Sequence, residues 1–139
     1  MDHAPTLRRM YEWVNSGDID AFFEHLAEDF LEHEVAPGQG PTREGTKALF
    51  KMMRAGFPDV RFDAEDIISS GDKVVARVRV TGTHAGTFMG IPATGKGVDI
   101  QTIDILRFGD DGLAHEHWGV MDVMSMMQQL GVVQGGPPV

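Results

Sequence analysis

The hydrophobic period of this sequence changes near residue 60, from the spacing of a helix to the alternation of a strand. Before that point apolar residues recur three and four positions apart, as at Leu7, Met10 and Val14. After it, apolar and polar residues alternate in four segments, at 60–68, 73–84, 98–108 and 113–121. Because helices come first and strands come late, hairpins can join the strands. The pattern predicts an α+β fold with a mostly antiparallel sheet and the helices on one face.

The other expected elements are shorter. Helical spacing returns at 19–26 and 44–55, and a last short helix is expected at 123–130, with Asp122 as its N-cap and Gly131 as its stop. A short strand is expected at 30–35. The glycine-rich segment 85–97 reads as a long connection at one rim of the sheet, and residues 134–139 as a frayed tail.

Length and charge narrow the classes of function. A chain of 139 residues with no dividing linker predicts one domain over 1–139. The net charge of -9 would repel a phosphate backbone, so we expect no nucleic-acid partner. Neither a signal peptide nor a long apolar span is apparent, and there is no cysteine. These features predict a cytoplasmic protein without a membrane partner.

Strand parity predicts which side chains face the interior. Val74, Ala76, Val78 and Val80 share one face, and extending the count puts His84 on that face unless a bulge at Gly82 reverses it. By the same count Leu31, His33 and Val35 share a face. Asp104 shares a face with Val98, Ile100, Leu106 and Phe108, which makes it an acid among apolar neighbours.

The turn at 109–112 sets the register of the last two strands. A three-residue loop with Gly112 at positive φ would place Gly109 opposite Leu113 and Asp104 opposite Trp118. A loop of two or four residues would place Asp104 opposite His117 instead. We favour the first register, which turns Glu116, Trp118 and Val120 inward and puts Asp122 at the inner end of the strand.

Each candidate residue has a structural alternative. Asp122 is a pocket acid or a helix cap, and spacing alone favours the cap. Asp104 is a pocket acid or the partner of an arginine such as Arg77 or Arg107. His33 and His84 are more often structural histidines than catalysts.

A metal site is the weaker interpretation of the C-terminal histidines. His115 and His117 flank Glu116 in a strand, so alternation puts the two histidines on one face and the glutamate on the other. We therefore expect no metal.

Several segments together resemble the SnoaL-like polyketide cyclases, also called predicted ester cyclases. They are EHWGVMD at 116–122, QQLG at 128–131, REGTKALF at 43–50, GFPDVRF at 56–62 and GTHAGTFMGIPATGK at 82–96. The resemblance implies the cone-shaped fold of nuclear transport factor 2, in which a curved sheet wraps around helices. It also implies a homodimer, and ring closure in a polyketide ester by intramolecular aldol condensation without cofactor.

The resemblance gives Asp122 the place of the family's general acid/base, ahead of the cap interpretation. The family often has a histidine near the position of Asp104. We accordingly expect Asp122 to remove a proton next to a carbonyl while Asp104, His33 or His84 hydrogen-bonds the enolate oxygen. The residues expected to hold a flat apolar or aromatic ligand are Trp118, Glu116, His117, Phe57, Phe88 and Met53.

Three classes of function stay open. The first is a cyclase or lyase. The second is another pocket enzyme of the same fold, an isomerase or a hydrolase, and the third is a non-enzymatic protein that binds a small molecule or a partner.

Overall fold

The computed structural model describes residues 2–36 and 38–133. The frayed tail expected at 134–139 lies outside these residues. No helix in the described part of the chain has the length and apolar character needed to cross a membrane.

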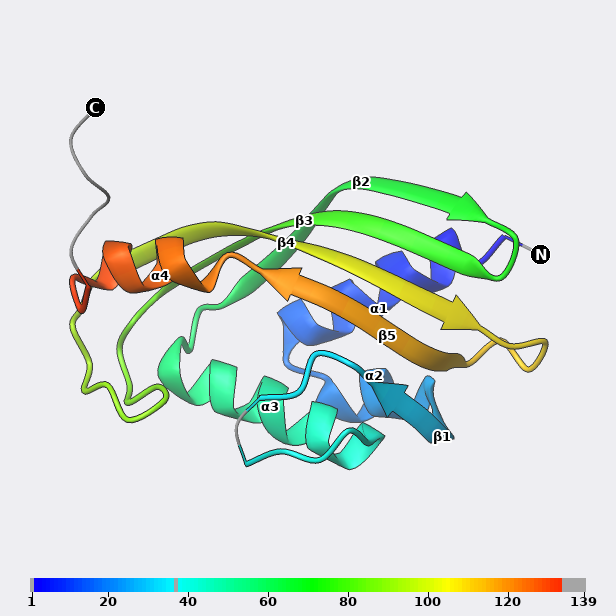
Figure 1. Ribbon diagram of the computed structural model, residues 1–139, viewed down its shortest axis with the longest axis horizontal. Helices are drawn as coiled ribbons and strands as arrows, with labels where there is room; N and C mark the ends of the chain where they lie inside the picture. The colour runs from blue at the N-terminus through cyan, green and yellow to red at the C-terminus, as the bar shows by residue number, and fades with distance from the viewer. Residues whose placement is uncertain (1, 37, 134–139) are drawn as a thin grey trace.

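Five strands form one curved sheet (Figure 1). In chain order they are β1 (Leu26–Glu32), β2 (Arg61–Ser70), β3 (Lys73–Thr83), β4 (Gly97–Phe108) and β5 (Ala114–Met121). Their order across the sheet is β1-β5-β4-β3-β2. The β2–β3, β3–β4 and β4–β5 pairs are antiparallel, whereas β1 runs parallel to β5. The sequence prediction of an α+β fold with a mostly antiparallel sheet is thus confirmed.

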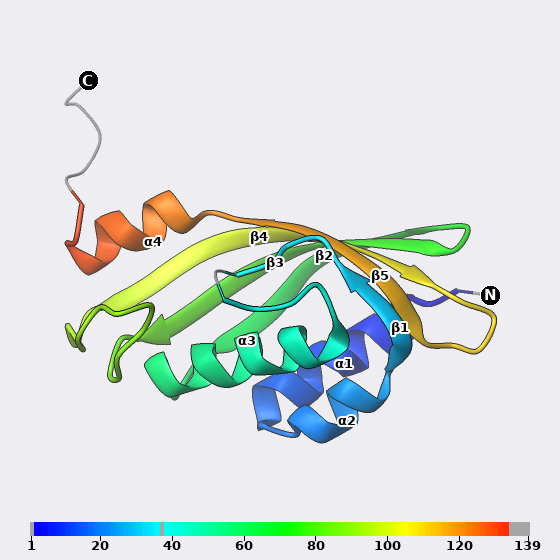
Figure 2. The same cartoon turned by 60° about the horizontal axis from the view of Figure 1, so that its bottom comes forward.

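Three helices cover one face of the sheet, and a fourth follows the last strand. They are α1 (Ala4–Ser16), α2 (Ile19–Glu24), α3 (Arg43–Gly56) and α4 (Val123–Leu130). Figure 2 shows α1, α2 and α3 beneath the concave side of the sheet, and α4 beyond the end of β5. The helices at 44–55 and 123–130 were therefore predicted to within one residue at each end.

The core lies between the concave face and the helices. Val74, Ala76, Val78 and Val80 are all buried, as strand parity predicts. Leu7 and Met10 of α1 pack against the same cluster. Because burial of each valine, leucine or methionine side chain stabilises the fold by about 1.5–3 kcal/mol, this alternation fixes which face of the sheet turns inward.

The first strand begins earlier than the sequence predicts. It spans Leu26–Glu32 instead of 30–35, and Leu26 belongs to the strand and not to the preceding helix. Helix α2 stops at Glu24, and the backbone N–H of Ala114 in β5 bonds to the carbonyl of His25. This pairing with a strand distant in sequence overrides the local helical spacing.

A β-bulge gives the last hairpin a register that differs from the predicted one. The turn itself is as expected, with Gly112 at φ 77 and the N–H of Gly109 bonded to the carbonyl of Leu113. Phe108 then pairs with Ala114 but Arg107 pairs with Glu116, so His115 is an extra residue. From there on every pair is shifted by one position.

The shift reverses the side chains of β5. Trp118 pairs with Ile105 and His117 pairs with Leu106, whose side chain is buried. The prediction that Trp118 faces Asp104 on the inner face is therefore wrong, and His117 is the inward residue. Without the bulge, the three-residue turn would have given the register expected from the sequence.

Candidate active site

The parallel pairing of β1 with β5 brings the acids at the end of β1 to the inner histidine of β5. Glu32 is the direct partner of His117 in the register of the two strands. Two residues further on, Glu34 lies on the same side, and its backbone N–H donates to the Glu32 carboxylate at 2.9 Å. Residues separated by some 85 positions in sequence thus meet at one edge of the sheet.

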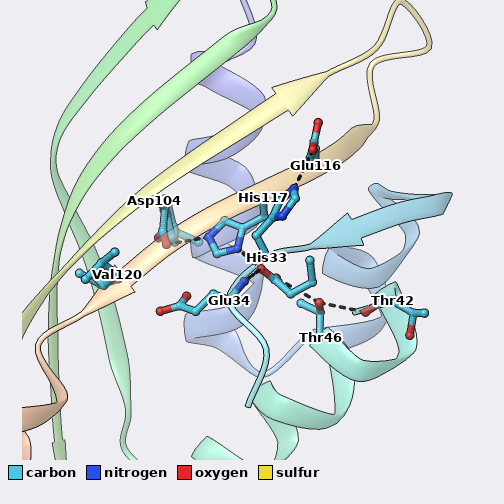
Figure 3. Close-up of polar contacts among 11 residues, drawn as sticks. His33, Glu34, Thr42, Thr46, Asp104, Glu116, His117 and Val120 are labelled. Atoms are coloured by element: carbon cyan, nitrogen blue, oxygen red, sulfur yellow. Dashed lines mark hydrogen bonds and ion pairs between the residues drawn. The ribbon is translucent and has the colours of Figure 1, made fainter. Parts of the chain in front are cut away.

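A chain of side-chain hydrogen bonds crosses the space between helices and sheet (Figure 3). The Tyr11 hydroxyl donates to Asp104 at 2.7 Å, and the other Asp104 oxygen accepts from His117 Nε2 at 2.8 Å. His117 Nδ1 bonds to Glu32 at 2.5 Å, and the Thr46 hydroxyl donates to the second Glu32 oxygen at 3.2 Å. The chain links α1, β4, β5, β1 and α3, so each of these elements helps to orient the central imidazole.

His117 carries a positive charge in this setting. Both of its nitrogens face carboxylates, which accept hydrogen bonds and cannot donate them when ionised, so both nitrogens must hold protons. Burial opposes the charged form, but the hydrogen bonds to Asp104 and Glu32 outweigh it and raise the pKa of His117 to about 10. A histidine fixed in the charged state stabilises nearby negative charge and is not a base at neutral pH.

Glu34 is the acid that stands outside this chain. Burial raises the pKa of Glu34 to about 7; the charge of His117 opposes the shift, and Asp104 and Glu32 add to it. No described side chain hydrogen-bonds to its carboxylate. Figure 3 shows the carboxylate beside the pair formed by Asp104 and His117. A carboxyl group that titrates near neutral pH can both take and return a proton.

The polar groups border a largely apolar cavity, which we describe as two neighbouring compartments. The inner compartment lies between α1, α3 and the sheet, and the polar groups that line it include Tyr11, Glu32, Glu34, Thr46, Asp104 and His117. The outer compartment is bordered by Val35, Phe88, Met89, Val123 and Met126.

Four residues line both compartments, namely Glu34, Leu49, Met53 and Met121. Among the described residues, Glu34 is the one charged residue that borders both compartments.

A glycine makes room for the two central side chains. A Cβ atom at Gly119 would lie 2.5 Å from Glu34 Oε1 and 2.7 Å from His117 Cε1. Contacts this short do not occur in folded proteins, so any larger residue would displace one of the two. Gly119 lets the carboxylate and the imidazole approach the same point.

The same residues have the composition of a metal-binding group. One ligand atom each from Glu34, Asp104 and His117 lies within 4.8 Å of the others. However, the Nε2 atom that would bind a cation carries the proton donated to Asp104. A metal ion would have to displace this proton from an imidazole whose pKa is raised, so the site favours the proton.

Asp122 lies elsewhere, as the N-cap of α4. Its carboxylate accepts from the backbone N–H of Ser125 at 3.1 Å and from the Ser125 hydroxyl at 2.7 Å. These two bonds lower the pKa of Asp122, the hydroxyl contributing more, and the residue is exposed. The carboxylate borders a polar surface groove with Arg79 and Asp99. The expectation that Asp122 meets Asp104 in a pocket is wrong, and the cap favoured by spacing is confirmed.

His33, Glu116 and Trp118 form a group on the outer face. His33 Nε2 bonds to Glu116 at 2.7 Å, and the His33 ring stacks on Trp118 with 4.9 Å between ring centres. Arg107 donates to the same glutamate at 3.1 Å. The alternation of β1 explains this placement, because His33 points away from the side that Glu32 and Glu34 share. None of the three lines the inner or outer compartment.

His84 is a buried structural residue of the rim connection. Its Nδ1 accepts from the backbone N–H of Thr94 at 3.2 Å, and its ring packs against Phe57. Phe57 belongs to the core, whereas Phe88 lines the outer compartment and Met53 lines both compartments. Of the ten candidate residues, the structure brings Asp104, His117, Met53 and Phe88 to the cavity.

Sequence reasoning missed several polar residues of the cavity, among them Tyr11, Glu32 and Glu34. Tyr11 falls in the helical spacing of Leu7, Met10 and Val14, which fits its ring but gives no sign of the role of its hydroxyl. Glu32 and Glu34 alternate with His33, so the strand pattern does contain the signal that they share a face. Two acids on one face of a short strand near the core could have been recognised as candidates.

The whole cavity lies within a region that matches a known family. The sequence profile of the SnoaL-like polyketide cyclase family matches residues 5–130. Aklanonic acid methyl ester cyclase DnrD of Streptomyces peucetius is 28% identical over 131 residues, which cover 90% of this chain and 88% of that protein. The enzyme of the same name from Streptomyces galilaeus, AcmA, is 26% identical over 128 residues, 90% of this chain and 88% of that protein.

Solved structures share the fold over nearly the full length. IdmH of Streptomyces antibioticus superimposes with a TM-score of 0.81 at 34% identity, over 93% of this chain and 98% of that one. AclR of Streptomyces galilaeus, described as a hydroxylase candidate, has a TM-score of 0.85 at 27% identity, over 97% of this chain and 84% of that one. The predicted cone-shaped fold is therefore confirmed, and it carries more than one suggested reaction.

Proposed function

Because the chain belongs to the SnoaL-like polyketide cyclase family, we propose that it closes a ring in a polyketide-type ester by intramolecular aldol condensation. The relatives whose names state an activity are methyl ester cyclases, which supports the same class of reaction here. The observation that carries the proposal is the placement of Glu34. Its carboxyl group titrates near neutral pH, lies beside the fixed charge of His117 and borders both compartments.

In the proposed mechanism Glu34 replaces Asp122 as the general acid/base. The ionised Glu34 carboxylate removes a proton from a carbon next to a carbonyl group, and that carbon bonds to a second carbonyl carbon of the same molecule. The alkoxide oxygen formed in this step takes the proton back from Glu34. The product is an isomer of the substrate, so the reaction consumes neither water nor a cofactor.

The neighbouring groups would lower the barrier by electrostatics. His117 remains charged throughout, because both of its N–H groups donate hydrogen bonds to ionised carboxylates. Its positive charge lies beside Glu34, so it offsets part of the negative charge that passes from Glu34 to the enolate and then to the alkoxide. Tyr11 and Thr46 restrain the two carboxylates that orient the ring. Asp104 and Glu32 are thus positioning residues in this mechanism.

The apolar compartments would hold the remainder of the substrate. Met53, Met121 and Leu49 form flexible apolar walls between the inner and outer parts. A flat, largely apolar molecule would place its reactive carbonyl groups near Glu34 and its other rings against these walls.

An assay with aklanonic acid methyl ester, the compound in the relatives' name, tests the proposal. Purified protein should convert it to a product of identical mass that has lost one ketone group and gained a ring, as mass spectrometry and NMR would show. An isomer without a new ring would assign the chain to isomerases of the same fold. The free acid, formed with release of methanol, would indicate a hydrolase, and either result would contradict ring closure.

A further inference from the structure

The charged groups along the cavity are mostly negative. Three carboxylates, those of Glu32, Glu34 and Asp104, line the inner compartment, and the imidazole of His117 is the counter-charge. Among the described residues that line either compartment there is no lysine or arginine. With Glu34 protonated, the two negative charges of Glu32 and Asp104 and the positive charge of His117 leave a net charge of one negative unit. Ionisation of Glu34 adds a second negative unit.

A ligand carboxylate would find no partner in this arrangement. Both nitrogens of His117 already donate to Asp104 and Glu32, and the Tyr11 hydroxyl donates to Asp104. The hydroxyls of Thr46 and Thr102 donate to Glu32 and to the carbonyl of Val120, and the other lining side chains are apolar and do not solvate an anion. An anion bound beside Glu34 would lose its hydration there, and the nearby cation, His117, is already paired with Asp104 and Glu32.

We infer that the cavity selects by charge, and that Glu34 is the residue that excludes free carboxylic acids while admitting their uncharged esters. The inference deepens the proposed function, on which it rests for the place of binding, and it assigns substrate discrimination to one residue. Two unit charges about 6 Å apart at an effective dielectric constant near 20 repel by enough to weaken binding at least tenfold, even after screening by salt.

The overall charge of the protein offers a competing explanation. A net charge of -9 repels any anion, wherever it binds. A matched control separates the two effects. Glu28 is an exposed acid of β1, outside the residues that line the cavity, so Glu28→Gln changes the net charge as much as Glu34→Gln does. Only Glu34→Gln removes charge from the lining of the cavity.

Methyl benzoate and benzoate are suitable probes, because they differ mainly in charge. Their dissociation constants would be measured at pH 8 by NMR of methyl-labelled methionines, with Met53 and Met121 reporting on the cavity walls. The additional methyl group of the ester favours it by about fourfold on its own. The quantity compared between variants is therefore the ratio of the two constants, in which this contribution cancels.

We expect wild type and Glu28→Gln to prefer the ester by well over tenfold, and Glu34→Gln to reduce that preference about tenfold. A second measurement uses the wild-type protein alone, so its result does not depend on whether the variant folds. At pH 5.5 Glu34 is protonated whereas benzoate is still ionised, so the preference should fall at this pH without any mutation. Glu32 on β1, Asp104 on β4 and His117 on β5 are the other charged groups that face Glu34.

Equal binding of ester and acid to wild type would overturn charge selection and leave the proposed reaction standing. An equal reduction in Glu28→Gln and Glu34→Gln would overturn the role of Glu34 and assign the effect to net charge. If the ester leaves the Met53 and Met121 signals unchanged, the cavity is not the binding site, and both the selection and the proposed function fail.

Discussion

Asp104 and Gly119 are direct partners across β4 and β5, so no side chain stands between the Asp104 carboxylate and the ring of His117. The ring reaches across this gap to within 2.8 Å of the carboxylate. The space that a side chain at 119 would fill is taken instead by Glu34 and the edge of the imidazole. The arrangement of the cavity therefore depends on the absence of a Cβ atom at position 119 of β5.

Gly119→Ala should lower cyclase activity at least tenfold while the protein stays folded. The new methyl group would collide with His117, which two hydrogen bonds hold in place, and with the free end of Glu34, which can move away. We expect a cost of about 1–3 kcal/mol in the free energy of unfolding. Gly97→Ala is the control, because its nearest contact is 3.8 Å and its effect should be small. Comparable losses in the two variants would contradict a special role for Gly119.

Glu34→Gln should stabilise the protein above neutral pH. The pKa of Glu34 is raised from 4.5 to about 7, so the folded state binds more protons than the unfolded state between these values. The contribution of Glu34 to the free energy of unfolding of the wild-type protein therefore falls as the pH rises from 4.5 to 7. Above pH 7 this contribution no longer changes. The variant lacks this loss, so at pH 8 its free energy of unfolding should exceed that of the wild type by about 1–2 kcal/mol. This value allows for the partial exposure of Glu34. Urea unfolding at pH 4, 6 and 8 measures the difference, which should be absent at pH 4; a difference independent of pH would contradict the assigned titration.

Tyr11→Phe should cost about 1–3 kcal/mol, because it removes a donor from a buried carboxylate. A double-mutant cycle with Asp104→Asn isolates this hydrogen bond from the packing of the ring. The two changes should be clearly non-additive in urea unfolding. Additive effects would mean that Tyr11 contributes only its aromatic ring to the core.

Asp122→Ala should lower stability by about 1 kcal/mol through loss of the helix cap, and Asp122→Asn should restore most of it. Thermal unfolding of the two variants measures this difference. A change confined to activity, with stability unaltered in both variants, would point back to a catalytic Asp122.

The alternation of single strands could be predicted from the sequence because it depends on local burial. Val74 to Val80 shows this, as does Asp104, an acid correctly expected among apolar neighbours. The prediction of the hairpin turn at Gly112 was also correct. Each of these features is decided by residues next to one another in the chain.

Long-range relations could not be predicted in this way. The bulge at His115 has no sequence signature of its own, yet it exchanges His117 for Trp118 on the inner face. The parallel pairing of β1 with β5 likewise brings Glu32 next to His117, although the two residues lie far apart in the sequence. The resemblance to a family directed attention to Asp122, whereas we propose Glu34, beside His117, as the general acid/base.

The most direct test of the central claim is the single-turnover rate of Glu34→Gln and Asp122→Asn on an ester that the wild-type protein cyclises. Glutamine keeps the shape of Glu34 but cannot take a proton, so the first variant should lose a factor of about 100 to 10,000 in rate. Asp122→Asn keeps the cap and should react at the wild-type rate. Full activity in Glu34→Gln, with a large loss in Asp122→Asn, would contradict the assignment of the acid/base to the cavity.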